Sequence, residues 1–175
     1  MSALPCASRL KPALPERLAA QQSSGRSSFN MASKPSFFLD TNVLLYALSH
    51  ADAEAEVEAE KRRIARQWLQ RVDWGLSTQV LMEFYVNAIK PRHGLPPGTA
   101  QRMAQRLAAA RPVQAVDAKL ALDAMQWQQA LTISPWDAAI LCAAHRLGAA
   151  TVVSEDLSHG QVYSGVRVLN PFMEA

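Results

Sequence analysis

Short apolar runs alternate with longer amphipathic segments along most of the chain. The short runs have the length of buried strands, and the longer segments repeat their apolar residues with the spacing of helices. This pattern predicts strands at 36–39, 74–77, 113–116, 150–154 and 166–170. It predicts helices at 42–50, 53–72, 78–89, 96–111, 117–131 and 135–147. Residues 155–165 are expected to form a loop.

The predicted strands are apolar throughout, which indicates a sheet that is buried on both faces. Parallel sheets are covered by helices on both sides, so their strands lack the alternation that half-exposed strands show. Strands that alternate with helices give the same indication. We therefore expect an α/β sandwich with a mainly parallel central sheet flanked by helices, spanning residues 34–175.

Residues 1–33 differ from the rest in composition, being rich in Ala, Ser, Pro and Gln without sustained periodicity. A segment of this kind buries too little apolar surface to offset the entropy of folding. We expect either a disordered tail or a start assigned too early, with Met31 as the true first residue. A transit peptide is the less favoured interpretation, because the prolines of this segment disfavour an amphipathic helix.

Composition and charge narrow the class of protein. Hydrophobic residues make up 49% of the chain, and no apolar run approaches the roughly 18 residues needed to cross a bilayer. Two cysteines, Cys6 and Cys142, do not make a disulfide framework, so a reducing cytoplasm is expected. The net charge of +3 equals that of residues 1–30, which leaves the remainder neutral. A polyanionic partner must therefore be argued from local charge.

Four acidic residues stand near the ends of predicted strands or in the helices that follow them. Asp40 ends the first strand, and Asp156 lies two residues past the strand "TVVS". Glu83 lies in the helix after "WGLS", and Asp137 opens the helix "PWDAAILCAAHRLG". Because ligands bind outside the carboxyl ends of parallel strands, we expect these carboxylates to gather at one edge of the sheet.

Each of these acids also has an ordinary structural role open to it. Asp40 could cap the following helix, Glu83 could face solvent, and Asp156 could be a turn residue. Asp137 fits a capping box with Ser134 and a proline in the first turn. Its helical face, however, is shared with apolar residues: Ile140, Leu141 and Ala144. That face favours an inward orientation of its carboxylate.

Taken together, four segments resemble the PIN-domain ribonucleases in order and spacing. The segments are "FFLDTNVLLYAL", "STQVLMEF", "SPWDAAILCAAHRLG" and "VVSEDLSHGQVYSGVRVLNPF". The similarity is greatest to the VapC-like toxins of bacterial toxin–antitoxin pairs, and it spans residues 36–172. The resemblance implies a parallel sheet flanked by helices, in agreement with the fold class expected from the pattern.

The resemblance also implies a set of site residues. The family's catalytic and metal-binding acids fall on Asp40, Glu83, Asp137 and Asp156. Supporting polar roles fall on Thr41, Asn42 and Ser154. Glu155, adjacent to Asp156, leaves the fourth acidic position open between the two. A set of oxygen ligands favours Mg²⁺ or Mn²⁺ over zinc.

By resemblance, the protein is expected to be a metal-dependent endoribonuclease, a hydrolase that acts as the toxin of a toxin–antitoxin system. An RNA substrate, an antitoxin protein and a homodimer are the implied partners, with no membrane. A non-catalytic PIN-like module that binds RNA or protein is the alternative. A phosphatase of the haloacid dehalogenase type is disfavoured, because Asn42 stands where that class needs a second Asp.

Basic residues gather between Glu83 and Asp117, a stretch that contains no acid. They are Lys90, Arg92, Arg102, Arg106 and Arg111. Arg102 and Arg106 are four residues apart and therefore share a helix face. A contact with RNA and a solvated face both fit this cluster. The candidate RNA-binding residues are Arg102, Arg106, Lys90 and Arg92.

Overall fold

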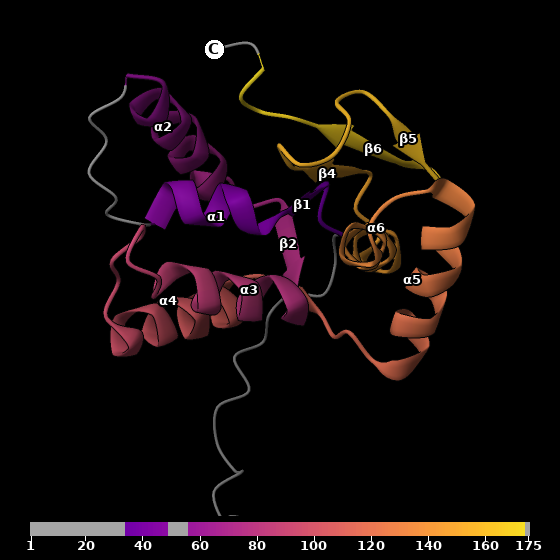
Figure 1. The fold of residues 1–175 in the computed structure, drawn as a ribbon, viewed down its shortest axis with the longest axis horizontal. Coiled ribbons are helices and arrows are strands. Elements are labelled where there is room, and N and C mark those ends of the chain that lie inside the picture. The colour runs from indigo at the N-terminus through magenta and orange to yellow at the C-terminus, as the bar shows by residue number, and fades with distance from the viewer. Residues whose placement is uncertain (1–33, 49–55, 174–175) are drawn as a thin grey trace, which may run out of the picture. The chain divides into compact units, whose positions relative to one another are not determined.

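The computed structural model describes residues 34–48 and 56–173 (Figure 1). The expectations for residues 1–33 lie outside the described part of the chain. The strands are β1 (Phe37–Leu39), β2 (Trp74–Ser77), β3 (Val113–Gln114), β4 (Thr151–Val153), β5 (Val162–Tyr163) and β6 (Val166–Leu169). The helices are α1 (Thr41–Leu48), α2 (Glu56–Gln70), α3 (Thr78–Ala88), α4 (Pro97–Ala110), α5 (Ala118–Leu131) and α6 (Pro135–Leu147).

The strands form one sheet in the order β3-β2-β1-β4-β6-β5. Neighbouring strands are parallel except for β5 and β6, which pair antiparallel. β1 lies between β2 and β4, so the end of the first strand is held on both sides. The expected mainly parallel sheet is confirmed.

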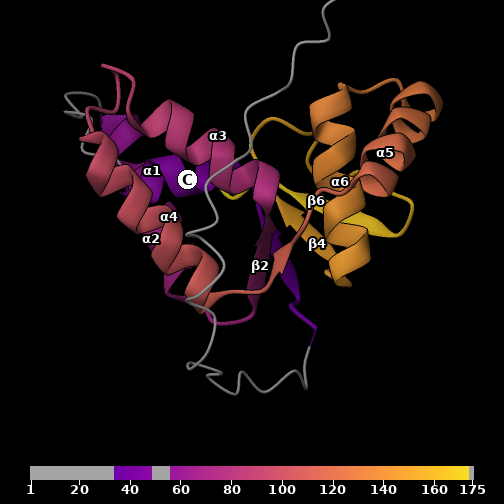
Figure 2. The same cartoon turned by 90° about the horizontal axis from the view of Figure 1, so that it is seen from below.

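Helices cover both sides of this sheet. Figure 2 shows α1–α4 on one side of the strands, and α5 and α6 on the other. α6 contacts β2, β3, β4 and β6, and α5 packs against α6. None of the described helices is long and apolar enough to cross a membrane.

The core lies between the sheet and its helices. The largest fully buried side chains are Trp74, Phe38, Phe84, Leu39, Leu44, Leu76, Leu120 and Leu141. Cys142 is also buried, as expected for a reduced thiol in an apolar helix. Because the strands are apolar on both faces, the ends of β1 and β4 are anchored in packed surroundings, and so are the polar residues that follow them.

The apolar pattern did not predict β5, which lies in the segment expected to be a loop. Its turn to β6 consists of Ser164 and Gly165, whose φ angles are 48° and 86°. A two-residue hairpin turn of the kind that suits the twist of strands requires positive φ at both positions, and Gly adopts it without strain. The Ser-Gly dipeptide was the available sequence signal. A two-residue strand is too short to show a period of its own.

Candidate functional site

Asp40 lies directly after β1, and α1 begins at the next residue. Its backbone N–H donates to the carbonyl of Val153 at 3.1 Å, which extends the pairing of β1 with β4. The residue is only 4% exposed. Asp40 is therefore a rigidly held, buried carboxylate at the carboxyl edge of a central strand, where ligands bind in open parallel sheets.

Three neighbouring groups donate hydrogen bonds to the carboxylate of Asp40. Its Oδ1 accepts from the backbone N–H of Thr41 at 2.6 Å. Its Oδ2 accepts from Ser154 Oγ at 2.6 Å and from Asn42 Nδ2 at 3.2 Å. Ser154 is fully buried at the end of β4. The ends of two adjacent strands thus fix the orientation of this acid.

The surroundings of Asp40 oppose its ionisation. Burial raises its pKa from 3.8 to about 7, and the nearby charges of Asp156 and Glu83 act in the same direction. The hydrogen bonds from Ser154 and Thr41 lower the pKa but offset only part of the burial. A positive charge close to this carboxylate would therefore favour its anionic form.

Asn42 links Asp40 to Asp156. Its Nδ2 donates to Asp40 Oδ2, to Ser154 Oγ at 3.2 Å and to Asp156 Oδ2 at 3.0 Å. The backbone N–H of Asp156 in turn donates to Ser154 Oγ at 3.1 Å. Among the described residues, the buried Oδ1 of Asn42 has no hydrogen-bond partner. The expected supporting residues thus connect the first acid to the fourth.

Glu83 joins the same cluster from α3. Its Oε2 accepts from the hydroxyl of Thr41 at 2.9 Å, and its Oε1 accepts from Gln79 Nε2 at 2.9 Å. Thr41 therefore contacts two of the expected acids, Asp40 through its backbone and Glu83 through its side chain. The start of α1 is the element that brings these carboxylates together.

Ser134 caps α6 as its sequence indicated, but in the described part of the chain the Asp137 carboxylate accepts from the Ser134 hydroxyl rather than from its backbone N–H, so the capping box is only half formed. Ser134 Oγ accepts from the backbone N–H of Asp137 at 3.1 Å and donates to Asp137 Oδ2 at 2.8 Å. Gln79, which also binds Glu83, donates to the carbonyl of Trp136 at 3.3 Å. Within the described part of the chain, no hydrogen bond joins Asp137 to the other three acids. A ligand role for Asp137 stays a prediction.

Glu155 points away from the acids toward α2. It forms an ion pair with Lys61 at 2.5 Å, and Lys61 also donates to the hydroxyl of Tyr46 at 3.2 Å. The ammonium group lies 5.4 Å from the centre of the Phe172 ring. Asp156 hydrogen-bonds Asn42, whereas Glu155 ties its loop to α2. This geometry favours Asp156 for the fourth acidic position.

A cavity of about 280 Å³ opens beside the acids. Thr41, Asn42 and Asp156 line it from the acidic cluster, and further lining comes from α2 and the α3–α4 connection. Of the basic residues predicted to bind RNA, Arg92 lines this cavity. Lys90 lies in the same connection as Arg92 and donates to a side chain of α3.

Arg102 and Arg106 lie elsewhere, on exposed positions of α4. Two further residues of the cavity, Arg62 and His93, were missed by the sequence analysis. Arg62 belongs to a run of alternating charges that is typical of a solvated helix face. His93 follows Arg92 in a connection without a recognisable motif. No local signal distinguished either residue.

The chemistry of the acidic cluster fits a hard divalent cation. Its potential ligand atoms are oxygens, burial destabilises the anionic form of its central carboxylate, and the neutral Oδ1 of Asn42 has no hydrogen-bond partner within the described ranges. Among the described residues, however, no three His, Cys, Asp or Glu side chains already stand at metal-ligand spacing. The amide nitrogen of Asn42 instead bridges Asp40 and Asp156.

Comparisons with known proteins identify the family and the fold of the chain. The PIN domain family matches residues 37–164, and no curated protein matches the chain. A toxin–antitoxin complex from Klebsiella pneumoniae is 21% identical with a TM-score of 0.53, over 78% of this chain and 98% of that one. DNA-bound VapBC from Salmonella typhimurium is 23% identical with a TM-score of 0.52, over 77% and 96%. VapC20 of Mycobacterium tuberculosis, a toxin that cleaves the sarcin–ricin loop, is 21% identical with a TM-score of 0.51, over 67% and 87%. These likenesses show a shared fold.

Proposed function

The chain belongs to the PIN domain family, and from this premise we propose that it is a metal-dependent endoribonuclease that cleaves RNA phosphodiesters. The observation that carries the proposal is the buried carboxylate of Asp40 at the end of the central strand, with Glu83 and Asp156 close enough to raise its pKa. Strongly perturbed acids in such positions are typical of sites that act on a ligand.

Within the proposed site, Asp40 and Asp156 would hold Mg²⁺ or Mn²⁺ with the help of Asn42, while Glu83 and Asp137 would complete the acidic set. When bound, the cation would stabilise charge on the phosphodiester and lower the pKa of an attacking water. The chain's own contribution is orientation. Ser154 and the N–H of Thr41 hold the Asp40 carboxylate in place, and the Thr41 hydroxyl holds Glu83.

We also propose that the protein is the toxin of a toxin–antitoxin pair. The similar structures from Klebsiella and Salmonella are a toxin–antitoxin complex and a VapBC complex, which supports an antitoxin protein as the partner of this chain. A homodimer is the proposed state of the toxin. An open reading frame for a small DNA-binding protein directly upstream would support the pairing.

A cleavage assay tests the proposed activity. The purified protein is incubated with mixed-sequence RNA while Mg²⁺ or Mn²⁺ is titrated, and EDTA is added to a parallel series. We expect metal-dependent cleavage by the parent and none by Asp40→Asn. Asp123→Asn serves as the matched control, because Asp123 lies on α5 in ion pairs with Lys119 and Arg146.

Equal cleavage by Asp40→Asn and the parent would contradict the role of Asp40. RNA binding by the parent without cleavage at any metal concentration would favour the alternative, a non-catalytic PIN-like module that binds RNA or protein. One observation favours a test of this alternative. The amide nitrogen of Asn42 bridges Asp40 and Asp156, and no three potential ligands among the described residues stand at metal-ligand spacing.

A further inference from the structure

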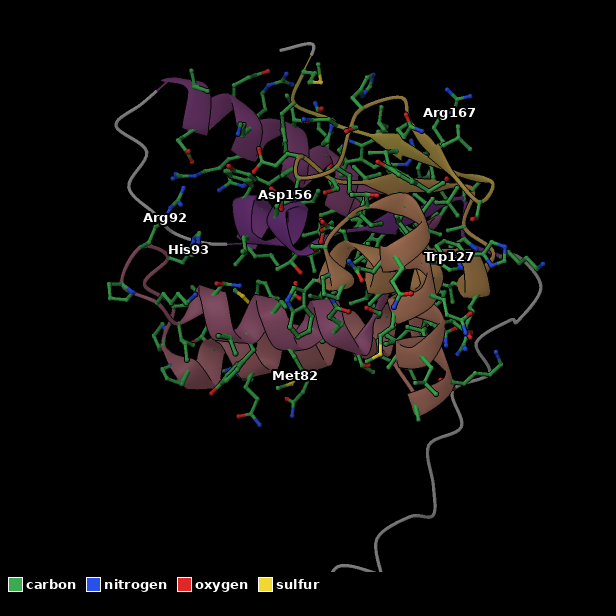
Figure 3. The ribbon with its side chains drawn as sticks, turned by 45° about the vertical axis from the view of Figure 1, so that its right-hand side comes forward. Met82, Arg92, His93, Trp127, Asp156 and Arg167 are labelled. Carbon is green, nitrogen blue, oxygen red and sulfur yellow. The ribbon has the colours of Figure 1, made fainter. Side chains whose placement is uncertain are left out.

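The cavity beside the acids has a second, basic wall. Arg62 comes from α2, and Arg92 and His93 come from the connection between α3 and α4. Figure 3 shows Arg92 and His93 near the C-terminal end of α1, while Asp156 lies over the helix itself. Two separate parts of the chain, α2 and the α3–α4 connection, thus place arginines in the same cavity as the acids.

One face of α1 connects the two ends of this cavity. Thr41 and Asn42 line it beside the acids, and Leu45 and Tyr46 line it one turn further along the helix. One turn corresponds to a rise of about 5.4 Å. The cavity therefore runs along α1 from the acidic cluster toward the basic wall, a direction in which an extended polymer strand can lie.

The two arginines of the basic wall are weakly neutralised. In the described part of the chain, Arg62 forms no hydrogen bond or ion pair, and Arg92 reaches Glu58 only at 3.9 Å with a side chain that is 73% exposed. An exposed pair at that distance contributes little. Of the two other acids that line the cavity, Glu155 is already paired with Lys61 and Asp156 accepts from Asn42. The guanidinium groups are therefore available to an anion.

His93 adds an unused hydrogen-bonding group. Its Nδ1 is buried and has no partner among the described residues. Burial lowers the pKa of His93, and the neighbouring charge of Arg92 lowers it further. The neutral imidazole can donate one hydrogen bond from whichever nitrogen carries the proton. The positive charge of the wall thus comes from the arginines, with His93 as a polar partner.

We propose that Arg62 and Arg92, together with His93, form a subsite for an RNA phosphate next to the phosphate that is cleaved. This inference rests on the proposed ribonuclease function and adds residues that bind the strand without taking part in the reaction. Guanidinium groups match phosphate oxygens in a planar, two-pronged geometry. Contacts to phosphate set the register of a strand rather than its sequence preference.

The subsite also answers an electrostatic difficulty of the acidic cluster. A site with several carboxylates repels a polyanion, and positive charge on the opposite wall offsets part of that repulsion. Arg102 and Arg106 on α4 do not line the cavity. They define an alternative path for the RNA strand, which would then cross α4 instead of entering the cavity.

Salt-dependent binding tests the subsite. Arg62→Gln/Arg92→Gln is made in the Asp40→Asn background, and affinity for a fluorescent single-stranded RNA of mixed sequence is measured in EDTA over a range of salt concentrations. The logarithm of the binding constant falls linearly with the logarithm of the salt concentration, and each phosphate contact on a single strand contributes about 0.7 to the steepness of that fall. The double variant is therefore expected to make the dependence shallower by about 0.7 to 1.4.

Arg63→Gln/Arg167→Gln is the matched control. It removes the same number of charges, from an α2 residue paired with Glu60 and from a β6 residue far from the cavity (Figure 3). We expect the control to keep the parent slope, and thermal melts confirm that both variants fold. When Asp40 is kept, Arg62→Gln/Arg92→Gln is expected to raise KM more than it lowers kcat, because the RNA phosphate bound at the subsite is not the one that is cleaved.

An unchanged slope in the Arg62/Arg92 variant, or an equal change in the control, overturns the subsite. A shallower salt dependence in Arg102→Gln/Arg106→Gln alone also overturns it and places the RNA strand across α4. If a poly-glutamate peptide rather than RNA loses affinity, the wall serves an acidic protein partner and the RNA subsite is refuted. These failures are distinct from failure of the proposed function, in which the parent itself neither binds nor cleaves RNA.

Discussion

The burial of Asp40 leads to a quantitative prediction about stability. Its pKa is raised from 3.8 to about 7, and this difference corresponds to about 4 kcal/mol by which the ionised side chain destabilises the folded protein. Because the folded-state pKa lies above the unfolded one, the penalty is absent below about pH 4. It grows as the pH rises toward 7 and is fully present above that value.

Asp40→Asn removes this penalty while keeping the shape of the side chain. The amide has one acceptor oxygen fewer, and a donor left without a partner, such as the Ser154 hydroxyl, costs about 1 to 3 kcal/mol at every pH. We therefore expect the variant to be less stable than the parent near pH 4 and more stable at pH 8. The difference in unfolding free energy between the two proteins should change by about 4 kcal/mol over that range.

Urea denaturation at several pH values in EDTA measures this difference. Mn²⁺ added at pH 8 should then stabilise the parent more than the variant, because the proposed ligand Asp40 would let the folded parent hold the cation more tightly. Asp123→Asn is the control with the opposite sign: Arg146 and Lys119 lower the pKa of Asp123, so the stability that its carboxylate contributes is lost only as the pH falls below about 4. Its replacement should therefore cost a nearly constant amount of stability between about pH 5 and 8. A parent-to-variant difference for Asp40 that stays constant from pH 4 to 8 would refute the reasoning.

Two further predictions concern the acids at the edge of the cluster. Asp137→Asn should abolish cleavage and reduce the stabilisation by Mn²⁺ in thermal melts; a loss of about 0.5 to 2 kcal/mol with full activity would leave only the capping role beside Ser134. Glu155→Gln should lower the cleavage rate, because the loop that carries Asp156 loses its ion pair with Lys61. The effect on stability should be small, because the pair is partly exposed. The charge-swapped protein, Lys61→Glu with Glu155→Lys, should recover activity in the same assay, and a swap that stays inactive would assign Glu155 a direct role.

The sequence by itself determined the fold class and predicted most residues of the candidate site. Apolar strands alternating with helices required a covered, mainly parallel sheet, because both features follow from periodicities that neighbouring residues set. The same local logic predicted Ser134 as the cap of α6, whose hydroxyl accepts from the backbone N–H of Asp137. The motif resemblance added Asp40, Glu83 and Asp156, which the structure brings close together.

Only the tertiary structure decided how these residues are connected. Asn42 reaches Ser154 and Asp156 across more than a hundred residues of sequence because β1 and β4 are adjacent strands. Glu155 pairs with Lys61 of α2, whereas the adjacent Asp156 accepts a hydrogen bond from Asn42, so only the packing of α2 distinguishes these two acids.

The basic wall of Arg62 and Arg92 depends on how α2 and the α3–α4 connection pack around α1. Neither arginine differs in its local sequence from one on a solvated face. Local sequence sets the direction of the chain over a few residues, whereas contacts between distant elements are set by how their apolar faces pack together. Charge placed in the cavity by that packing has no signature in the sequence.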